Sequence, residues 1–258
     1  MRGWVMAVLA FLAWAGALEA QRIRSRRDVD YSQYNTAYDG RLTFLRLRYD
    51  PLTGWGGRFG GGEAGWAHDY PRAERNLMKL LSELTTIRPY MEGSNIFPMD
   101  DKEIFKYPVA YLSEPGFWSL SEAEAVGLRA YLQKGGFLIV DDFDGPHWIN
   151  FAEKMRTVLP DGAILPLEAS HPVFHAFFDI ESLEALAHGG YRSLSEGAKY
   201  YGVFEGNDPK GRLMVVVNYN NDIGDYWEWS DQGYFPIELS NEAYKLGINY
   251  MVYAMTHD

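Results

Sequence analysis

Three carboxylates and an imidazole lie close together in the middle of the chain. Asp141, Asp142 and Asp144 follow the apolar stretch Phe137–Val140, and His147 comes shortly after them. Continuous apolar runs are typical of buried parallel strands, and ligands of open α/β sheets bind at the carboxyl ends of such strands. These side chains can hold a divalent metal, or supply a general base whose pKa is raised by crowded like charges. A third interpretation is that Asp142 or Asp144 caps the helix that follows.

A second polar group follows the strongest strand pattern of the chain, residues 213–217. Asn220 and Asp222 begin a pattern similar to a calcium loop, but Ile223 occupies the position of the required glycine, which rejects an EF-hand. A different calcium or polar-ligand site remains open, as does an Asx turn without a ligand. Trp227 lies near these amides and acids, where its ring would suit stacking on the face of a sugar.

A glycine-rich stretch over residues 50–67 is the third candidate region. Its glycines formally match the dinucleotide fingerprint, but the match does not follow a strand directly, as that fingerprint requires. No glycine in the stretch precedes a lysine, so the Walker pattern fails. A loop of this length is either functional or irregular. If it faces a ligand, we expect Arg58, Trp66 and His68 to contact that ligand.

Composition excludes several classes of protein. Hydrophobic residues make up 47% of the chain and aromatic residues 16%, which permits a sizeable core and argues against disorder. The formal net charge of −11 argues against binding to nucleic acid, whose phosphates repel an acidic surface. The chain has no cysteine, so we expect neither a disulfide nor a cysteine nucleophile.

The N-terminus has the pattern of a secretory signal. Arg2 precedes an apolar stretch that is too short to span a bilayer comfortably. We expect a signal peptide over residues 1–20, cut between Ala17 and Gln21, with an uncleaved anchor as the alternative. A flexible arm over 21–40 and a single domain over 41–258 would follow. The mature protein would then be periplasmic or extracellular, with no membrane insertion after cleavage.

Strand patterns alternate with helical ones along the rest of the chain. Asp69 is a predicted N-cap with Pro71 in the first turn, and Ser121 begins a capping box. Alternation of this kind predicts an α/β fold, a three-layer sandwich with a mostly parallel central sheet and helices on both faces. The expected strands cover residues 42–49, 107–112, 137–140, 200–205 and 212–219, and the closing helix covers residues 242–255.

The chain from Leu42 to His257 resembles the DUF4159 family, an uncharacterised bacterial domain family. The resemblance implies a class I glutamine amidotransferase-like, flavodoxin-like fold. The segments that carry it are Gly60-Gly61-Gly62-Glu63, Tyr111-Leu112-Ser113-Glu114-Pro115-Gly116, Gly135-Gly136-Phe137-Leu138-Ile139-Val140-Asp141-Asp142, His171-Pro172-Val173-Phe174 and Asn218-Tyr219-Asn220-Asn221-Asp222.

The same resemblance implies which chemistry is missing. Active amidotransferases carry their catalytic cysteine where this chain has the turn after Val140, here made of aspartates. The segment around Glu114 resembles the loop that supplies their oxyanion hole. His171-Pro172 resembles their His-Pro-Glu motif, but Val173 stands in place of the acid. The resemblance therefore implies a retained pocket without glutamine hydrolysis.

Two functional hypotheses follow from these patterns. The first is an exported, non-catalytic binding or assembly module that uses the degenerate crevice for a small polar ligand, a glycan or a protein partner. The alternative is a metal-assisted hydrolase that uses Asp141, Asp142, Asp144 and His147. The sequence predicts no cofactor, and a divalent metal remains the open alternative.

Overall fold

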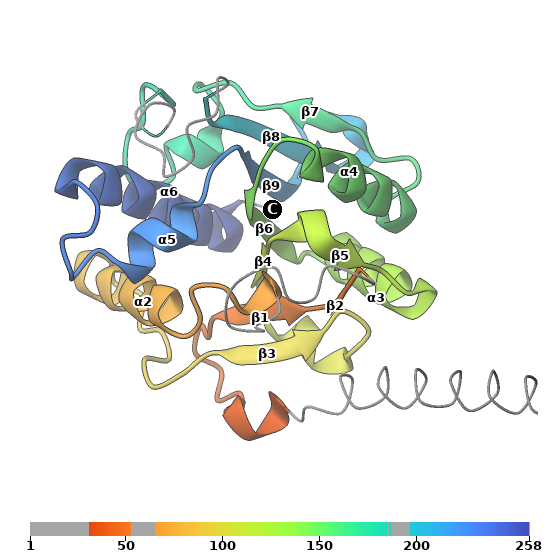
Figure 1. The fold of residues 1–258 in the computed structure, drawn as a ribbon, viewed down its shortest axis with the longest axis horizontal. Coiled ribbons are helices and arrows are strands. Elements are labelled where there is room, and N and C mark those ends of the chain that lie inside the picture. Colours follow the sequence, from red (N-terminus) through yellow and green to blue (C-terminus); the bar gives the residue numbers. More distant parts are fainter. Residues whose placement is uncertain (1–30, 53–64, 185, 187–196, 258) are drawn as a thin grey trace, which may run out of the picture. The chain divides into compact units, whose positions relative to one another are not determined.

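Seven strands form one mixed sheet in the computed structural model, in the order β3-β1-β4-β6-β9-β8-β7 (Figure 1). The structure describes residues 31–52, 65–184, 186 and 197–257, so the predicted signal peptide and Arg58 lie outside the described residues. The five strands from β3 to β9 run parallel, whereas β8 pairs antiparallel with β9 and β7 pairs antiparallel with β8. The strands are β1 (Leu45–Arg48), β3 (Asn95–Pro98), β4 (Val109–Ser113), β6 (Phe137–Phe143), β7 (Ile164–Pro166), β8 (Lys199–Phe204) and β9 (Leu213–Tyr219).

Helices cover both faces of this sheet (Figure 1). One face carries α2 (Arg72–Leu84), α5 (Ile223–Glu228) and α6 (Ile237–Thr256), which pack against one another. The other face carries α3 (Glu122–Gln133) and α4 (His147–Val158). The predicted α/β fold with a mostly parallel sheet is therefore confirmed.

Short elements connect these layers. The strands β2 (Asp50–Pro51) and β5 (Trp118–Ser119) form a small antiparallel pair of their own. The single-turn helices are η1 (Tyr31–Tyr34), η2 (Gly65–Ala67), η3 (Lys102–Lys106), η4 (Pro115–Phe117), η5 (Pro172–Phe174) and η6 (Glu205–Asn207).

The chain changes direction across the sheet at β1. It passes from β1 to β3 on one side and then crosses to β4 on the other side of β1. Ligands of open α/β sheets bind outside the carboxyl ends of the strands at such a switch point. The segments that leave β1, β4, β6 and β9 therefore surround the position where we expect a site.

Strand β6 is the central element of the core. All seven of its residues are buried, including Asp141 and Asp142 at its carboxyl end. The register with β9 shifts between Val140 and Phe143, so the strand is irregular where the two aspartates stand. Such irregularities re-aim side chains beside functional sites. The strand thus continues past the predicted end at Val140 and carries two carboxylates into the interior.

The structure confirms one predicted helix cap and contradicts two others. The capping box of α3 has both of its reciprocal hydrogen bonds, between Ser121 and Glu124. Helix α4 begins at His147 with Pro146 at the N-cap position, so neither Asp142 nor Asp144 occupies that position. Helix α2 likewise begins after Pro71 without a side-chain cap, and Asp69 has a positive φ of 66° instead.

Strand β3 is an edge strand that the sequence patterns did not indicate. The side chain of Asn35 pairs with Ile96 as a neighbouring strand would: its Nδ2 donates to Ile96 O at 2.9 Å, and its Oδ1 accepts from Ile96 N at 2.7 Å. Asn95 pairs in the same manner with the backbone of Thr36. The exposed edge of the sheet is thereby covered by side-chain amides.

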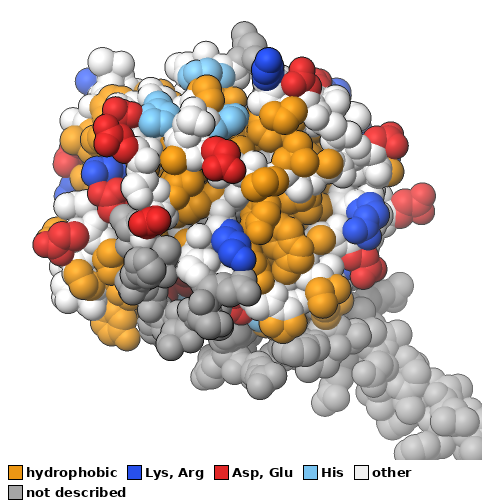
Figure 2. Space-filling view, turned by 90° about the horizontal axis from the view of Figure 1, so that it is seen from above, with side chains coloured by type: hydrophobic (Ala, Val, Ile, Leu, Met, Phe, Trp, Pro, Cys, Tyr) orange, Lys and Arg blue, Asp and Glu red, His pale blue; other side chains and the backbone are white. Residues whose placement is uncertain are grey.

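Acidic side chains of the described residues do not form one continuous patch on the face that Figure 2 presents. Acidic side chains lie dispersed there, with basic side chains among them and a group of hydrophobic ones between (Figure 2). Among the described residues, no helix combines the length and the apolar character needed to cross a membrane.

Candidate functional site

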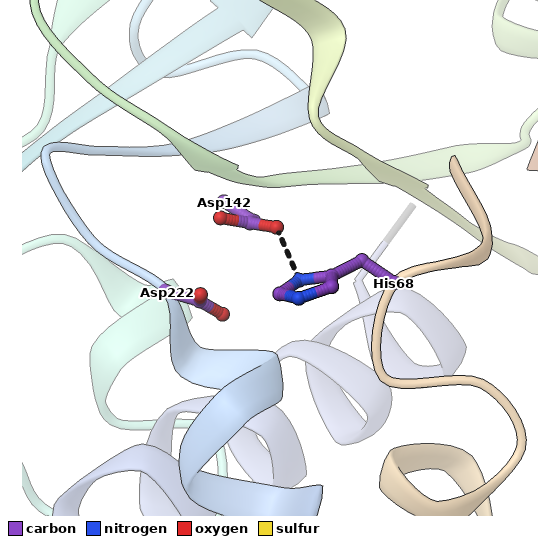
Figure 3. A group of neighbouring side chains, drawn as sticks. All are labelled: His68, Asp142 and Asp222. Atoms are coloured by element: carbon purple, nitrogen blue, oxygen red, sulfur yellow. Dashed lines mark hydrogen bonds and ion pairs between the residues drawn. The ribbon is translucent and has the colours of Figure 1, made fainter. Parts of the chain in front are cut away.

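His68, Asp142 and Asp222 meet beyond the carboxyl ends of the parallel strands (Figure 3). His68 follows η2, Asp142 is the last residue but one of β6, and Asp222 stands before the first turn of α5. The His68 Nδ1 atom lies 2.9 Å from Asp142 Oδ2. One ligand atom from each of the three residues lies within 4.8 Å of the others. This spacing is short enough for all three to bind one cation.

Asp69 and Asp225 form a second group with the same histidine. His68 Nδ1 lies 3.3 Å from Asp69 Oδ1, and ligand atoms of His68, Asp69 and Asp225 again lie within 4.8 Å of one another. Asp69 is 4% exposed and Asp225 is 6% exposed, so both carboxylates are buried. The site thus concentrates four carboxylates around one imidazole.

Several of these carboxylate oxygens have no hydrogen-bond donor. Neither oxygen of Asp69 accepts a hydrogen bond within the described part of the chain, and the same is true of Asp222 Oδ2. The other oxygen of Asp222 accepts from Asp225 N at 3.0 Å and so caps α5. A buried charge without a partner is costly unless a cation or a proton neutralises it.

The pKa values reflect this crowding. The hydrogen bond that His68 donates to Asp142 raises the pKa of His68 to about 10, assisted by the charges of Asp69, Asp142 and Asp225 and opposed by burial. Burial raises the pKa of Asp69 and that of Asp222 well above their usual range, and the charge of Asp142 adds to both shifts. Burial also raises the pKa of Asp225. In the metal-free protein, His68 is therefore a cation that partly balances a set of acids reluctant to ionise.

Asp141 holds two elements of the site together. Its Oδ2 accepts hydrogen bonds from Tyr111 Oη at 2.8 Å and from Gly224 N at 3.0 Å. Burial, followed by the charge of Asp142, raises the pKa of Asp141 to about 7. The side chain connects β6 to the start of α5, the helix that presents Asp222 and Asp225.

Arg46 positions the segment that carries His68. This guanidinium on β1 is fully buried and donates to Trp66 O at 2.9 Å and to His68 O at 2.8 Å. Its Nε donates to Glu74 Oε1 of α2 at 2.5 Å. The buried ion pair thereby attaches both the backbone of residues 66–68 and the helix after it to the first strand.

Asp142 adopts a backbone conformation that is uncommon for residues with side chains. Its φ is 61°, and Ser113 Oγ at the end of β4 donates to its Oδ2 at 3.3 Å. Positive φ values in residues other than glycine cost energy and occur preferentially at functional sites. Glu114 and Asn220, which directly follow the neighbouring strands β4 and β9, also have positive φ values of 48° and 55°.

The four-residue cluster predicted from the sequence separates into three environments. Asp142 faces His68, and Asp141 faces Tyr111 and Gly224. Asp144 lies 3.7 Å from His147 Nδ1, and the His147 ring packs on Phe117. Neither Asp144 nor His147 belongs to the groups of described residues that could hold a metal. Successive side chains at the end of β6 point in different directions, so these neighbouring carboxylates have different contacts.

Of the remaining predicted ligand residues, Trp66, Glu114 and Trp227 are buried and Asn220 is half-buried. Trp66 is 3% exposed, and its backbone carbonyl binds Arg46. Glu114 is 2% exposed, beside Gly65. Asn220 Oδ1 accepts from Gly145 N and so supports the turn after β6. Trp227 is 1% exposed and donates to Ala243 O, so its ring has no free face for a sugar.

Sequence patterns did not indicate Asp69 and Asp225 as site residues. Asp69 precedes Pro71 with the spacing of a helix cap, so it was predicted to cap the helix and was not considered as a ligand. Asp225 follows Asp222 by three residues, which places both side chains on one face of a helix. The spacing of Asp222 and Asp225 could have indicated a pair of ligands, but only the structure shows that both lie beside His68.

Fold and site together define an α/β domain with a cluster of buried aspartates around a partly exposed histidine, at the carboxyl edge of a mostly parallel sheet. A family model described as "Domain of unknown function (DUF4159)" matches residues 43–255, so the chain belongs to this family. All five residues of the cluster lie within the matched range. A comparison with curated proteins gives no match.

Proposed function

We propose that the domain binds a divalent metal cation with His68, Asp142 and Asp222, and through that cation a polar ligand. The observation that carries this proposal is Asp222 Oδ2, which is buried without a hydrogen-bond donor beside the His68–Asp142 pair. A cation between these side chains would supply the charge that the carboxylates lack. The domain would thus be a binding module that recognises its ligand at the carboxyl edge of the sheet.

The chemistry of the donor atoms indicates which cations fit. One imidazole nitrogen with two or more carboxylate oxygens suits Mn²⁺, Zn²⁺ or Co²⁺. Ca²⁺ is bound by six to eight oxygens and makes no use of an imidazole. We therefore expect transition metals to bind more tightly than Ca²⁺.

The finer fold assignment, a flavodoxin-like and amidotransferase-like domain, is also a proposal. It is supported by the order of the five parallel strands across the sheet. Numbered along the chain, these strands have the order 2-1-3-4-5, which is the flavodoxin-like order. The turn after Val140, where the resemblance implies a nucleophile, contains Asp142 with its positive φ. Because the chain has no cysteine, we propose that this crevice serves ligand binding and not glutamine hydrolysis.

The test is metal binding by protein stripped with EDTA. Isothermal titration with Mn²⁺, Zn²⁺, Mg²⁺ and Ca²⁺ should show binding of the transition metals, with a matching rise in Tm. Asp142→Asn and Asp222→Asn should abolish both signals. Asp144→Asn is the matched control, because this aspartate of the same turn faces His147 instead. Unchanged binding in Asp142→Asn and Asp222→Asn would reject the site.

Metal-assisted hydrolysis is the second candidate function. The observation that favours it is the partial exposure of His68, whose side chain is 39% exposed while the surrounding carboxylates are buried. A bound cation with access to solvent can lower the pKa of a coordinated water to about 7 and so provide a nucleophile. Hydrolysis of phosphate, ester or amide substrates that requires Mn²⁺ and is lost in Asp142→Asn would establish it.

A further inference from the structure

We propose that the site holds a second divalent cation, bound by Asp69 and Asp225 next to the first. This inference rests on the proposed function, because it assumes a cation at His68, Asp142 and Asp222. It adds that the centre is binuclear and that its ligand is an oxyanion able to bridge two cations.

The geometry provides two overlapping groups of ligand atoms. His68 belongs to both, with its Nδ1 2.9 Å from Asp142 Oδ2 and 3.3 Å from Asp69 Oδ1. Since one nitrogen atom binds one cation, the second would be bound by the oxygens of Asp69 and Asp225. Water and ligand oxygens would complete its coordination, as is usual for cations such as Mg²⁺ that keep several waters.

Each group contains its own buried carboxylate without a hydrogen-bond donor. In the first group this is Asp222, through Oδ2, and in the second it is Asp69, through both oxygens. Asp69 is 4% exposed, so solvent does not satisfy these atoms. A cation confined to the first group would leave the oxygens of Asp69 without a partner.

The balance of charge also favours two cations. Asp69, Asp142, Asp222 and Asp225 carry four negative charges when ionised, and the imidazole is neutral when it binds a metal. One dication neutralises half of this charge, whereas two neutralise all of it. The nearby Arg46 does not change the balance, because Glu74 pairs with it. Unneutralised charges in such a buried site would be costly.

Gly224 keeps space open beside Asp69. A Cβ atom at this position would lie 2.4 Å from Asp69 Oδ2 and 2.8 Å from Tyr111 Oη. A side chain there would push the Asp69 carboxylate away from Asp225. Gly224→Ala would therefore displace Asp69 or the first turn of α5, which lies between Asp222 and Asp225.

A pair of cations defines the class of ligand. Two-metal sites hold their ions about 3.5–4 Å apart and stabilise the oxygens of a phosphate or a similar group between them. We therefore infer that the ligand carries an oxyanion, such as a phosphate monoester. Phosphate is the simplest probe of this inference.

The experiment measures the number of bound ions. Full-length protein is equilibrated with Mn²⁺, dialysed, and analysed for metal content and by electron paramagnetic resonance. We expect two ions per chain with the spectrum of a magnetically coupled pair. Asp225→Asn should bind one ion and show an uncoupled spectrum, while Asp144→Asn should still bind two. Inorganic phosphate should change the coupled spectrum.

The outcomes separate this inference from the function on which it rests. If the wild-type protein binds one ion, and Asp225→Asn binds it equally well, the second cation is rejected and the first remains. If the wild-type protein binds none, both proposals fail. Asp225→Asn removes a buried charge from a crowded site and should fold, and its circular dichroism and Tm verify that it does. A spectrum unaffected by phosphate would reject the oxyanion as ligand.

Discussion

The Nδ1 atom of His68 lies 2.9 Å from Oδ2 of Asp142, although 74 positions separate the two residues. The histidine follows the first strand and the aspartate is the last residue but one of the fourth parallel strand along the chain. Their contact crosses β4, which lies between β1 and β6. It joins two of the three segments that surround the buried carboxylates, and the third is the start of α5.

Neutralising one carboxylate should stabilise the metal-free protein. We expect Asp222→Asn to raise the free energy of unfolding in EDTA by about 1–3 kcal/mol, the cost of a buried polar group without a partner. The asparagine oxygen can still accept the bond from Asp225 N that caps α5. Urea unfolding in EDTA measures the change.

The same variant should lose the stabilisation that Mn²⁺ gives to the wild-type protein. A residue that binds the metal should show both effects when it is replaced: the protein becomes more stable in EDTA, and Mn²⁺ no longer stabilises it. If Asp222→Asn instead destabilised the metal-free protein, the carboxylate would be structural. Asp231→Asn, at an exposed position, should change neither quantity.

The stability of the metal-free protein should fall as the pH rises. The pKa of His68 is raised to about 10, so the imidazolium contributes stability that is fully present below the unfolded pKa of about 6.5 and is lost towards pH 10. The raised pKa values of Asp69, Asp222 and Asp225 act in the same direction from about pH 4 upward. Unfolding in EDTA between pH 5 and 9 should therefore show a continuous decline.

Replacing the histidine isolates its share of this pH dependence. His68→Gln should flatten the decline above about pH 6.5, and the slope below that pH should remain. A wild-type protein whose stability rises between pH 7 and 9 in EDTA would contradict the charge distribution described for the site.

Removing the counter-charge of Arg46 should destabilise the fold. Arg46 is fully buried and Glu74 is 2% exposed, so Glu74→Gln leaves a buried cation without its partner. We expect a loss of about 3–5 kcal/mol in urea unfolding. Glu242→Gln is the control, because its bond to Lys245 lies near the surface and should contribute less than about 1 kcal/mol.

The same change should weaken metal binding, because Arg46 also holds the carbonyl oxygens of Trp66 and His68. Titration with Mn²⁺ at a temperature where Glu74→Gln is still folded measures this effect. Unchanged affinity would show that the His68 segment keeps its position without the ion pair.

The side chain of Asn35 should matter for the edge of the sheet. Asn35→Ala removes two hydrogen bonds to the backbone of Ile96 and leaves that N–H and carbonyl without their partner. We expect a loss of about 1–3 kcal/mol. Asn35→Asp keeps an acceptor for Ile96 N but cannot donate, and so should be intermediate. Equal stability of all three proteins would show that this edge needs no cover.

Much of the scaffold could be predicted from local patterns. The apolar runs at 137–140 and 213–217 became β6 and β9, and Ser121 with Glu124 made the predicted capping box. These features depend on residues a few positions apart, which is the range over which a sequence pattern acts. Strand β3 was missed because it has only four residues and its ladder partner β1 lies about 50 positions away in the chain.

The site was predicted only in part. Asp142, Asp222 and His68 were candidates from three separate patterns, and the structure brings them together. The patterns also grouped Asp144 and His147 with Asp142 because they are close in sequence, whereas the backbone turn after β6 separates them. Asp69 was assigned to a helix cap, and its positive φ turns the carboxylate towards Asp225 instead.

Local sequence patterns were sufficient to predict the class of fold, the family and the edge of the sheet at which the candidate site lies. Periodicity and strand composition are local, and parallel strands bring their carboxyl ends to one edge whatever the connecting loops contain. Which carboxylates come together around His68, and which of their oxygens lack a donor, is a property of the tertiary structure. It depends on burial, on the direction of each side chain and on the position of β4 between β1 and β6. All three are set by contacts between residues far apart in the chain. The interior charge that makes the cluster a candidate metal centre exists only after these contacts have excluded water.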